Sequence, residues 1–106
     1  MARSLIKVSP NPRRGEVMEI KTLISHEMET GFRHTNTGTA IPRDIITTFV
    51  ATYNGEEIFA AQLYPAIAAN PFITFYTVAR DSGVLEFRWT GDNGYAVSEQ
   101  VKITVA

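Results

Sequence analysis

Residues 84–90 decide the fold, and they read Val84-Leu85-Glu86-Phe87-Arg88-Trp89-Thr90. Apolar and polar side chains alternate here without a break. In an extended strand successive side chains point to opposite faces of the sheet. The face with Leu85, Phe87 and Trp89 is therefore expected in a core, and the opposite face is expected in water. This pattern is typical of an antiparallel sheet that is covered on one side.

Turn signals bracket this segment and recur along the chain. Gly83 precedes it, and the tract Gly91-Asp92-Asn93-Gly94 follows it, before a last strand expected at residues 95–105. A second Asn-Gly pair, Asn54-Gly55, separates strand-like residues 45–53 from 56–64. Asn and Gly tolerate the positive φ angles of a two-residue hairpin turn, so a β-hairpin is predicted there.

Three more strands are expected at residues 5–8, 16–25 and 72–80. Pro10 and Pro12 interrupt regular structure between the first two. The alanine-rich residues 65–70 suit one helical turn. About seven short strands with almost no helix predict an all-β fold, an immunoglobulin-like antiparallel β-sandwich. A small closed barrel has the same strand count and stays open as an alternative.

Composition limits the classes of function. The chain has 106 residues, the size of one domain, and we expect residues 1–106 to form a single unit. Its net charge of −1 argues against nucleic-acid binding and against electrostatic attraction to a membrane surface. No apolar stretch approaches the roughly 20 residues that span a bilayer. The first eight residues do not read as a signal peptide, because Lys7 interrupts their apolar run.

The sequence carries no recognisable catalytic motif. It lacks cysteine, a phosphate-binding glycine loop and a nucleophile elbow. We therefore expect no catalytic residue, no cofactor and no enzyme activity. One alternative is a metal site in which His26 and His34 act with Glu27 or Glu29. Their spacing is not that of a His-Glu-x-x-His helix, so solvated loop side chains are the favoured interpretation.

The long loop at residues 26–42 is the main candidate for a binding site. It and its flanks concentrate chemistry that is common at interfaces, in His26, Met28, Glu29, Arg33 and Arg43. Methionine adapts to varied surfaces, and arginine is enriched at interface hot spots. Glu29 is expected to brace the loop by pairing with Arg33 or Arg43. The alternative is a solvated crossover whose charges have no function.

Two other surfaces are candidates for contact with a partner. An Asn70-Pro71 turn would display Phe72, although the favoured interpretation is that Phe72 begins a strand and is buried in the core. The hairpin at residues 45–64 is rich in uncharged Thr and Tyr, so it offers a face or an edge for another chain. Self-association of the chain when it is alone is a further alternative.

Four segments resemble the SoxZ family: GEVMEIKTLISHEMETGFR at residues 15–33, IPRDII at 41–46, YNGE at 53–56 and ANPF at 69–72. The likeness runs from about residue 10 to the C-terminus. Its most specific part is the string His-x-Met-Glu-x-Gly-x-Arg at residues 26–33.

The resemblance implies a non-catalytic subunit of a SoxYZ carrier in bacterial thiosulfate oxidation. In that family SoxY carries the sulfur substrate on a cysteine near its C-terminus, and SoxZ supplies an immunoglobulin-like partner in a heterodimer. A chain without cysteine agrees with this division of roles. The resemblance also implies transient contact with other Sox enzymes, and a periplasmic location reached by export with the partner. The partner-binding residues expected on this basis are His26, Met28, Glu29, Arg33, Arg43 and Phe72.

Overall fold

The computed structural model describes residues 3–65, 67 and 69–106, and it contains seven strands and one short 3-10 turn. The strands are β1 (Ser4–Val8), β2 (Val17–Ile24), β3 (Ile46–Tyr53), β4 (Glu56–Gln62), β5 (Phe72–Val78), β6 (Gly83–Gly91) and β7 (Ala96–Ile103); the turn is η1 (Asp92–Gly94). Each strand lies within two residues of its predicted range. The helical turn expected at residues 65–70 includes residues 66 and 68, which are outside the described residues.

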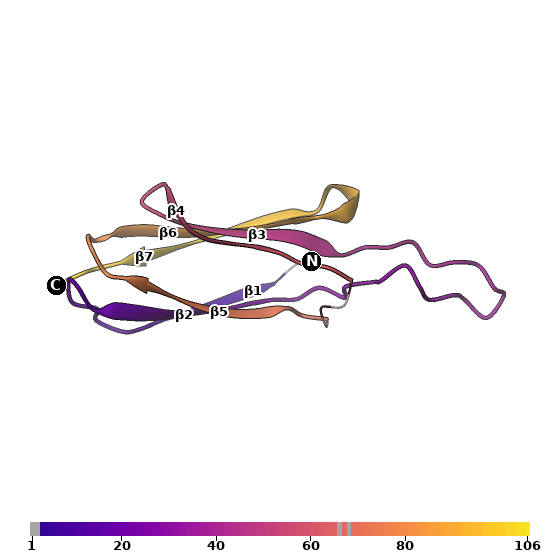
Figure 1. Ribbon diagram of the computed structural model, residues 1–106, viewed down its shortest axis with the longest axis horizontal. Coiled ribbons are helices and arrows are strands. Elements are labelled where there is room, and N and C mark those ends of the chain that lie inside the picture. The colour runs from indigo at the N-terminus through magenta and orange to yellow at the C-terminus, as the bar shows by residue number, and fades with distance from the viewer. Residues whose placement is uncertain (1–2, 66, 68) are drawn as a thin grey trace.

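The strands form two antiparallel sheets that face each other (Figure 1). One sheet has three strands in the order β1-β2-β5, and the other has four in the order β4-β3-β6-β7. The predicted all-β sandwich is therefore confirmed, and the barrel alternative is wrong because the strands divide into two separate sheets. No helix among the described residues is long and apolar enough to cross a membrane.

Large aromatic side chains hold the two sheets together. Phe87 and Trp89 are fully buried, as the alternation in β6 predicts, and Phe49 of the neighbouring β3 is fully buried as well. The ring centroid of Phe49 lies 5.2 Å from that of Trp89 and 6.2 Å from that of Phe75 on β5. Phe59 of β4 stacks on Phe75 with 4.6 Å between centroids, so the contact crosses between the sheets. Buried aromatic residues of this size dominate the hydrophobic stabilisation of a small core.

Backbone geometry at two turns explains the glycine positions. Asn54 and Gly55 have φ angles of 49° and 85°, as the predicted β3–β4 hairpin turn requires. Gly91 ends β6 where the backbone of β3 begins. A Cβ atom at Gly91 would lie 2.3 Å from the carbonyl oxygen of Ile45, so only glycine fits this approach.

Tyr53 fastens the end of β3 to the segment between β5 and β6. Its side chain is buried, and its hydroxyl accepts hydrogen bonds from the backbone N–H groups of Arg80 (3.0 Å) and Asp81 (3.1 Å). The same hydroxyl donates to the carbonyl oxygen of Asp81. One side chain thus satisfies three backbone groups, which would otherwise lose their hydrogen bonds.

We predict that Tyr53→Phe lowers the free energy of unfolding by about 2 kcal/mol, because it leaves backbone groups unsatisfied next to the core. Urea denaturation measures the loss. Tyr76→Phe is the matched control: Tyr76 is exposed, its hydroxyl donates only to Glu19, and its removal should change stability by less than about 0.5 kcal/mol. Equal effects of the two substitutions would contradict the structural role of Tyr53.

Candidate functional site

The segment between β2 and β3, residues 25–45, forms a long arm that projects beyond the end of the sandwich (Figure 1). It gives the molecule an elongated shape with extents of 59 × 21 × 20 Å. The arm is not an irregular loop. Its two halves are connected by backbone hydrogen bonds, reciprocally between Glu29 and Asp44 (both 2.8 Å) and from Ile41 to Arg33 (2.9 Å). The arm is therefore a narrow hairpin-like extension of the fold, joined by two isolated β-bridges, Glu29 with Asp44 and His34 with Ala40.

A tight turn at residues 35–39 closes the tip. The N–H of Gly38 donates to the carbonyl of Thr35, and the N–H of Thr35 donates to the carbonyl of Thr39. Further back, Gly31 has a φ of 88°, and a Cβ atom there would lie 3.0 Å from the Cβ atom of Arg43 on the opposite half. Gly31 therefore allows the two halves to approach closely. The sequence predicts a long loop at residues 26–42, and the two bonded halves of the arm are not expected from it.

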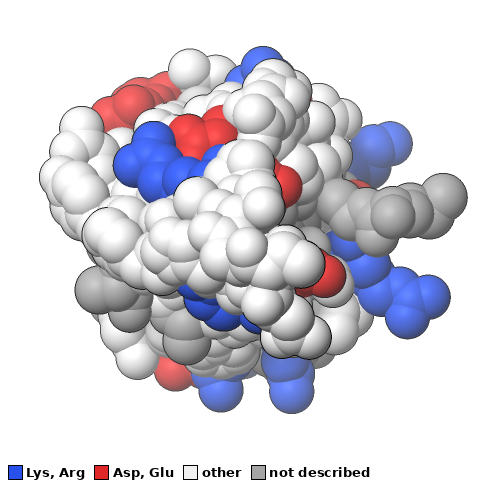
Figure 2. All heavy atoms as spheres, turned by 90° about the vertical axis from the view of Figure 1, so that its right-hand side faces the viewer, with Lys and Arg blue, Asp and Glu red and all other residues white. Residues whose placement is uncertain are grey.

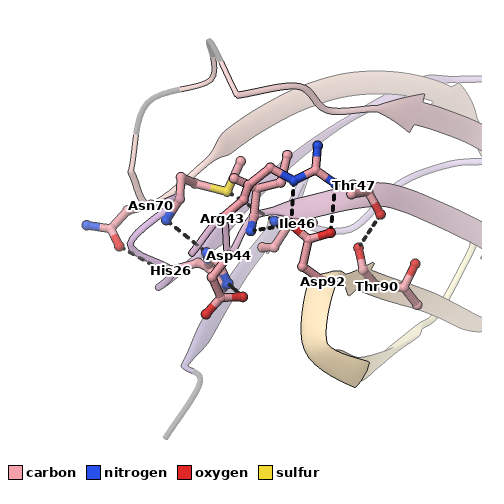
Figure 3. Close-up of polar contacts among 10 residues, drawn as sticks. His26, Arg43, Asp44, Ile46, Thr47, Asn70, Thr90 and Asp92 are labelled. Carbon is pink, nitrogen blue, oxygen red and sulfur yellow. Dashed lines mark hydrogen bonds and ion pairs between the residues drawn. The ribbon is translucent and has the colours of Figure 1, made fainter. Parts of the chain in front are cut away.

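An ion pair fixes the base of the arm to the four-stranded sheet (Figure 3). The guanidinium of Arg43 donates two hydrogen bonds to the carboxylate of Asp92 in η1, at 2.8 and 2.9 Å. The backbone N–H of Ile45 donates to the same carboxylate at 3.2 Å. The hydrogen bond from Arg43 holds the pKa of Asp92 below its ordinary value. The expected pairing of Glu29 with Arg43 does not occur, because Arg43 is bound to Asp92.

Glu29 pairs instead with Arg33, the other predicted partner. The Nε atom of Arg33 lies 3.1 Å from Oε2 of Glu29, and this hydrogen bond lowers the pKa of the carboxyl group. The Glu29 side chain is 12% exposed, whereas the Arg33 side chain is 68% exposed. The pair braces the first half of the arm and leaves the outer face of the guanidinium in solvent.

His26 and Met28 lie at the root of the arm, and both side chains are buried. Met28 has a φ of 54°, and its Sδ atom accepts a hydrogen bond from the N–H of Ile46 at 3.3 Å. The Nδ1 atom of His26 accepts one from the N–H of Met28 at 3.0 Å. The backbone of His26 is bonded to Asn70 from the loop before β5 (Figure 3). Both residues therefore shape the root of the arm.

Tyr95 completes the root. Its ring lies edge-on to the His26 ring at 4.8 Å. Its hydroxyl is buried and forms no hydrogen bond with any described residue. Burial raises the pKa of Tyr95, and the charge of Asp44 raises it further. No sequence pattern singles out Tyr95 or Asp92, because both act through contacts with residues far away along the chain.

Exposed aromatic residues at this end of the molecule include Phe32 and Phe72. Phe32 on the arm is 79% exposed, and sequence reasoning missed it, although a lone aromatic residue after Gly31 in a polar segment was the available signal. Phe72 begins β5, as predicted, but it is 61% exposed. The favoured expectation that Phe72 belongs to the core is therefore wrong, because its position in the β5 alternation faces away from the other sheet.

The structure does not support the metal-site alternative. Among residues 3–65, 67 and 69–106, no cluster of three or more His, Asp or Glu side chains has the proximity needed to hold an ion. His26 lies at the root of the arm with its Nδ1 atom already accepting a hydrogen bond. His34 is exposed near the tip, bridged to Ala40.

The sequence matches the family described as sulphur oxidation protein SoxZ over residues 6–102. The chain belongs to the SoxZ family. Membership makes it a subunit of a Sox sulfur-oxidation complex, in which SoxZ partners SoxY. The matched residues include the whole arm and every strand except the ends of β1 and β7. No curated protein matches the sequence.

Two solved structures with a similar fold are described as superoxide reductases. A superoxide reductase (neelaredoxin) from Ignicoccus hospitalis has a TM-score of 0.75 and 14% identity; 97% of this chain and 80% of that chain are covered. A putative superoxide reductase from Thermotoga maritima has a TM-score of 0.69 and 13% identity, with 97% and 85% covered. At this identity the likeness shows the sandwich fold alone, since one fold carries many functions.

We predict that Asp92→Asn lowers the free energy of unfolding most at neutral pH and progressively less in acid. A carboxyl group whose pKa is depressed on folding stabilises the protein above its unfolded pKa, and this stabilisation is lost as the pH falls through its folded pKa. Urea unfolding between about pH 7 and pH 3 should show the two stability curves converging.

Glu57→Gln provides the control, because it removes the same charge from an exposed residue of β4 for which the described residues provide no ion-pair partner. If the Asp92→Asn and Glu57→Gln variants were equally stable at neutral pH, the ion pair at the base of the arm would not contribute to the stability of the protein.

Proposed function

We propose that this chain is the non-catalytic subunit of a periplasmic SoxYZ-like carrier in thiosulfate oxidation. It binds the SoxY-like subunit, which carries the sulfur substrate on a C-terminal cysteine, and it supplies no reacting group itself. The observation that carries the proposal is the family match over residues 6–102. In this proposal the other Sox enzymes contact the complex only transiently, since they act on the substrate held by the partner.

The amino-acid composition supports this division of labour. Covalent carriage of a sulfur group requires a thiolate that attacks and is later released by exchange at sulfur. None of the 106 residues is cysteine. The chain therefore cannot hold a sulfur adduct of that kind, and its contribution to the pathway has to come through binding.

The arm is the first surface that we assign to contact with the partner subunit. Residues 35–40 at its tip contain no charged side chain. Viewed end-on from the side of the arm, the surface nearest the reader is mostly uncharged, with basic and acidic side chains around it (Figure 2). Phe32 and Arg33 stand out from the arm, and aromatic and arginine side chains are the types most often found at interface hot spots. In this proposal His26, Met28, Glu29 and Arg43 act by holding the arm in place.

Co-expression with the SoxY-like protein of the same organism tests the proposed function. We expect the two chains to co-purify and to elute as a one-to-one complex in size-exclusion chromatography, with masses confirmed by native mass spectrometry. Light scattering on the chain alone distinguishes a monomer from a self-associating module. A chain that ignores the SoxY-like protein and forms only a dimer with itself would overturn the proposal.

We predict that Arg33→Ala weakens the complex by roughly tenfold, because it removes an exposed guanidinium from the interface. Calorimetry or surface plasmon resonance with the SoxY-like subunit measures the change. Arg14→Ala is the matched control: Arg14 is also an exposed, ion-paired arginine, but it lies between β1 and β2 in a segment that is bonded to the C-terminal residue Ala106. If the two variants bound the SoxY-like subunit with equal affinity, the arm would not be part of the interface.

A further inference from the structure

The outer faces of the two sheets present different chemistry to solvent. On the three-stranded sheet five large apolar side chains face outward and are between 46% and 64% exposed: Leu5, Val17, Phe72, Tyr76 and Val78. On the four-stranded sheet the outward positions carry small or polar side chains such as Thr48, Thr52, Arg88, Ser98 and Gln100. Exposed apolar side chains gathered on one face mark an interaction surface.

The strand register arranges this face in rows across the sheet. Leu5 of β1 pairs with Leu23 of β2, and Leu23 pairs with Phe72 of β5, so the three side chains form one apolar row. Directly opposite residues in an antiparallel pair have Cβ atoms about 5 Å apart, which makes the row continuous. A groove of 350 Å³ lies along it. The row is at the end of the sheet from which the arm emerges, because β2 ends at Ile24.

The next row is basic. Lys7 pairs with Lys21 across β1 and β2, and like charges directly opposite each other destabilise a sheet. Lys21 is partly neutralised by Glu19 at 3.5 Å, whereas no acidic group within the described residues forms an ion pair with Lys7. Glu19 is also the acceptor of the Tyr76 hydroxyl. A carboxylate from another molecule, placed between the two ammonium groups, would relieve their repulsion.

The same charges disfavour two symmetric arrangements in which a second copy of this chain would be the occupant. In a symmetric face-to-face dimer with its axis along the strands, each row meets itself, so the lysine rows would face each other. With the axis along the apolar row, the lysine row would face the row that contains Arg3, which pairs through its backbone with Ser25. Both arrangements place basic groups together, which an interface avoids.

We propose that the outer face of the β1-β2-β5 sheet, centred on the Leu5-Leu23-Phe72 row and the adjacent Lys7 and Lys21, binds the SoxY-like subunit together with the neighbouring arm. The matching surface of that subunit is apolar and carries a carboxylate. This inference rests on the proposed function and identifies the face that performs it. It differs from the expectation that the Thr-rich hairpin at residues 45–64 receives another chain.

Affinity measurements with the co-expressed SoxY-like subunit test the assignment. Phe72→Glu should weaken binding at least about 30-fold, as expected for a central aromatic anchor. The pair Lys7→Glu and Lys21→Glu, made together, should weaken binding at least about tenfold and remove the loss of affinity that added salt causes in the wild type. Ala60→Glu is the matched control on β4, where the same glutamate enters an exposed strand position of the other sheet and should leave affinity within about twofold.

The outcomes distinguish an error in the assigned face from an error in the proposed function. Phe72 is exposed, so its substitution should leave the thermal unfolding curve close to that of the wild type. A variant that fails to fold is replaced in the comparison by the lysine reversals, which do not touch the core. If the wild type binds and both sets of variants bind equally well, the face is wrong and the proposed function stands. If the wild type does not bind the SoxY-like subunit, both the function and the face are overturned.

Discussion

Burial of large aromatic side chains between two sheets is the constraint on which the rest of the structure depends. Phe49 and Phe87 of one sheet meet Phe75 of the other, Trp89 packs beside Phe49, and these contacts fix which side of every strand faces inward. Since strand side chains alternate, the inward set also determines the outward set. The apolar row and the lysine pair on the three-stranded sheet are therefore a consequence of the register that the core enforces.

A second constraint acts where the chain leaves the core. The arm has no hydrophobic interior of its own, and only isolated β-bridges join its two halves, so its direction depends on its attachment to the sandwich. Arg43 and Asp92 provide a bidentate contact to the four-stranded sheet, and Met28 and His26 fill the root. Most of the residues that first suggested a binding site thus hold the arm in position, while Phe32, Arg33 and Phe72 are among the exposed side chains at this end.

The strands could be predicted from the sequence because their signals are local. The alternation in residues 84–90 and the Asn54-Gly55 turn each depend on neighbouring residues only. The arm could not be predicted in the same way. Its polar residues do not alternate with apolar ones, and Arg43 pairs with Asp92, which lies 49 positions further along the chain. Met28 is a second example. A methionine in a polar segment indicates an interface residue, whereas in the structure its sulfur atom accepts a hydrogen bond from the backbone of Ile46.

The likeness to superoxide reductases does not bear on function, since it concerns the sandwich alone. Function in this chain follows from its family and from what its surfaces present. Lysine is rare in the sequence, with Lys7 and Lys21 on the three-stranded sheet and Lys102 on β7 of the other sheet. Zero-length carbodiimide cross-linking of the complex with the SoxY-like subunit, followed by peptide mass spectrometry, uses this distribution directly. We expect cross-links from Lys7 or Lys21 to aspartate or glutamate of the partner, and cross-links from Lys102 alone would contradict binding through the three-stranded sheet.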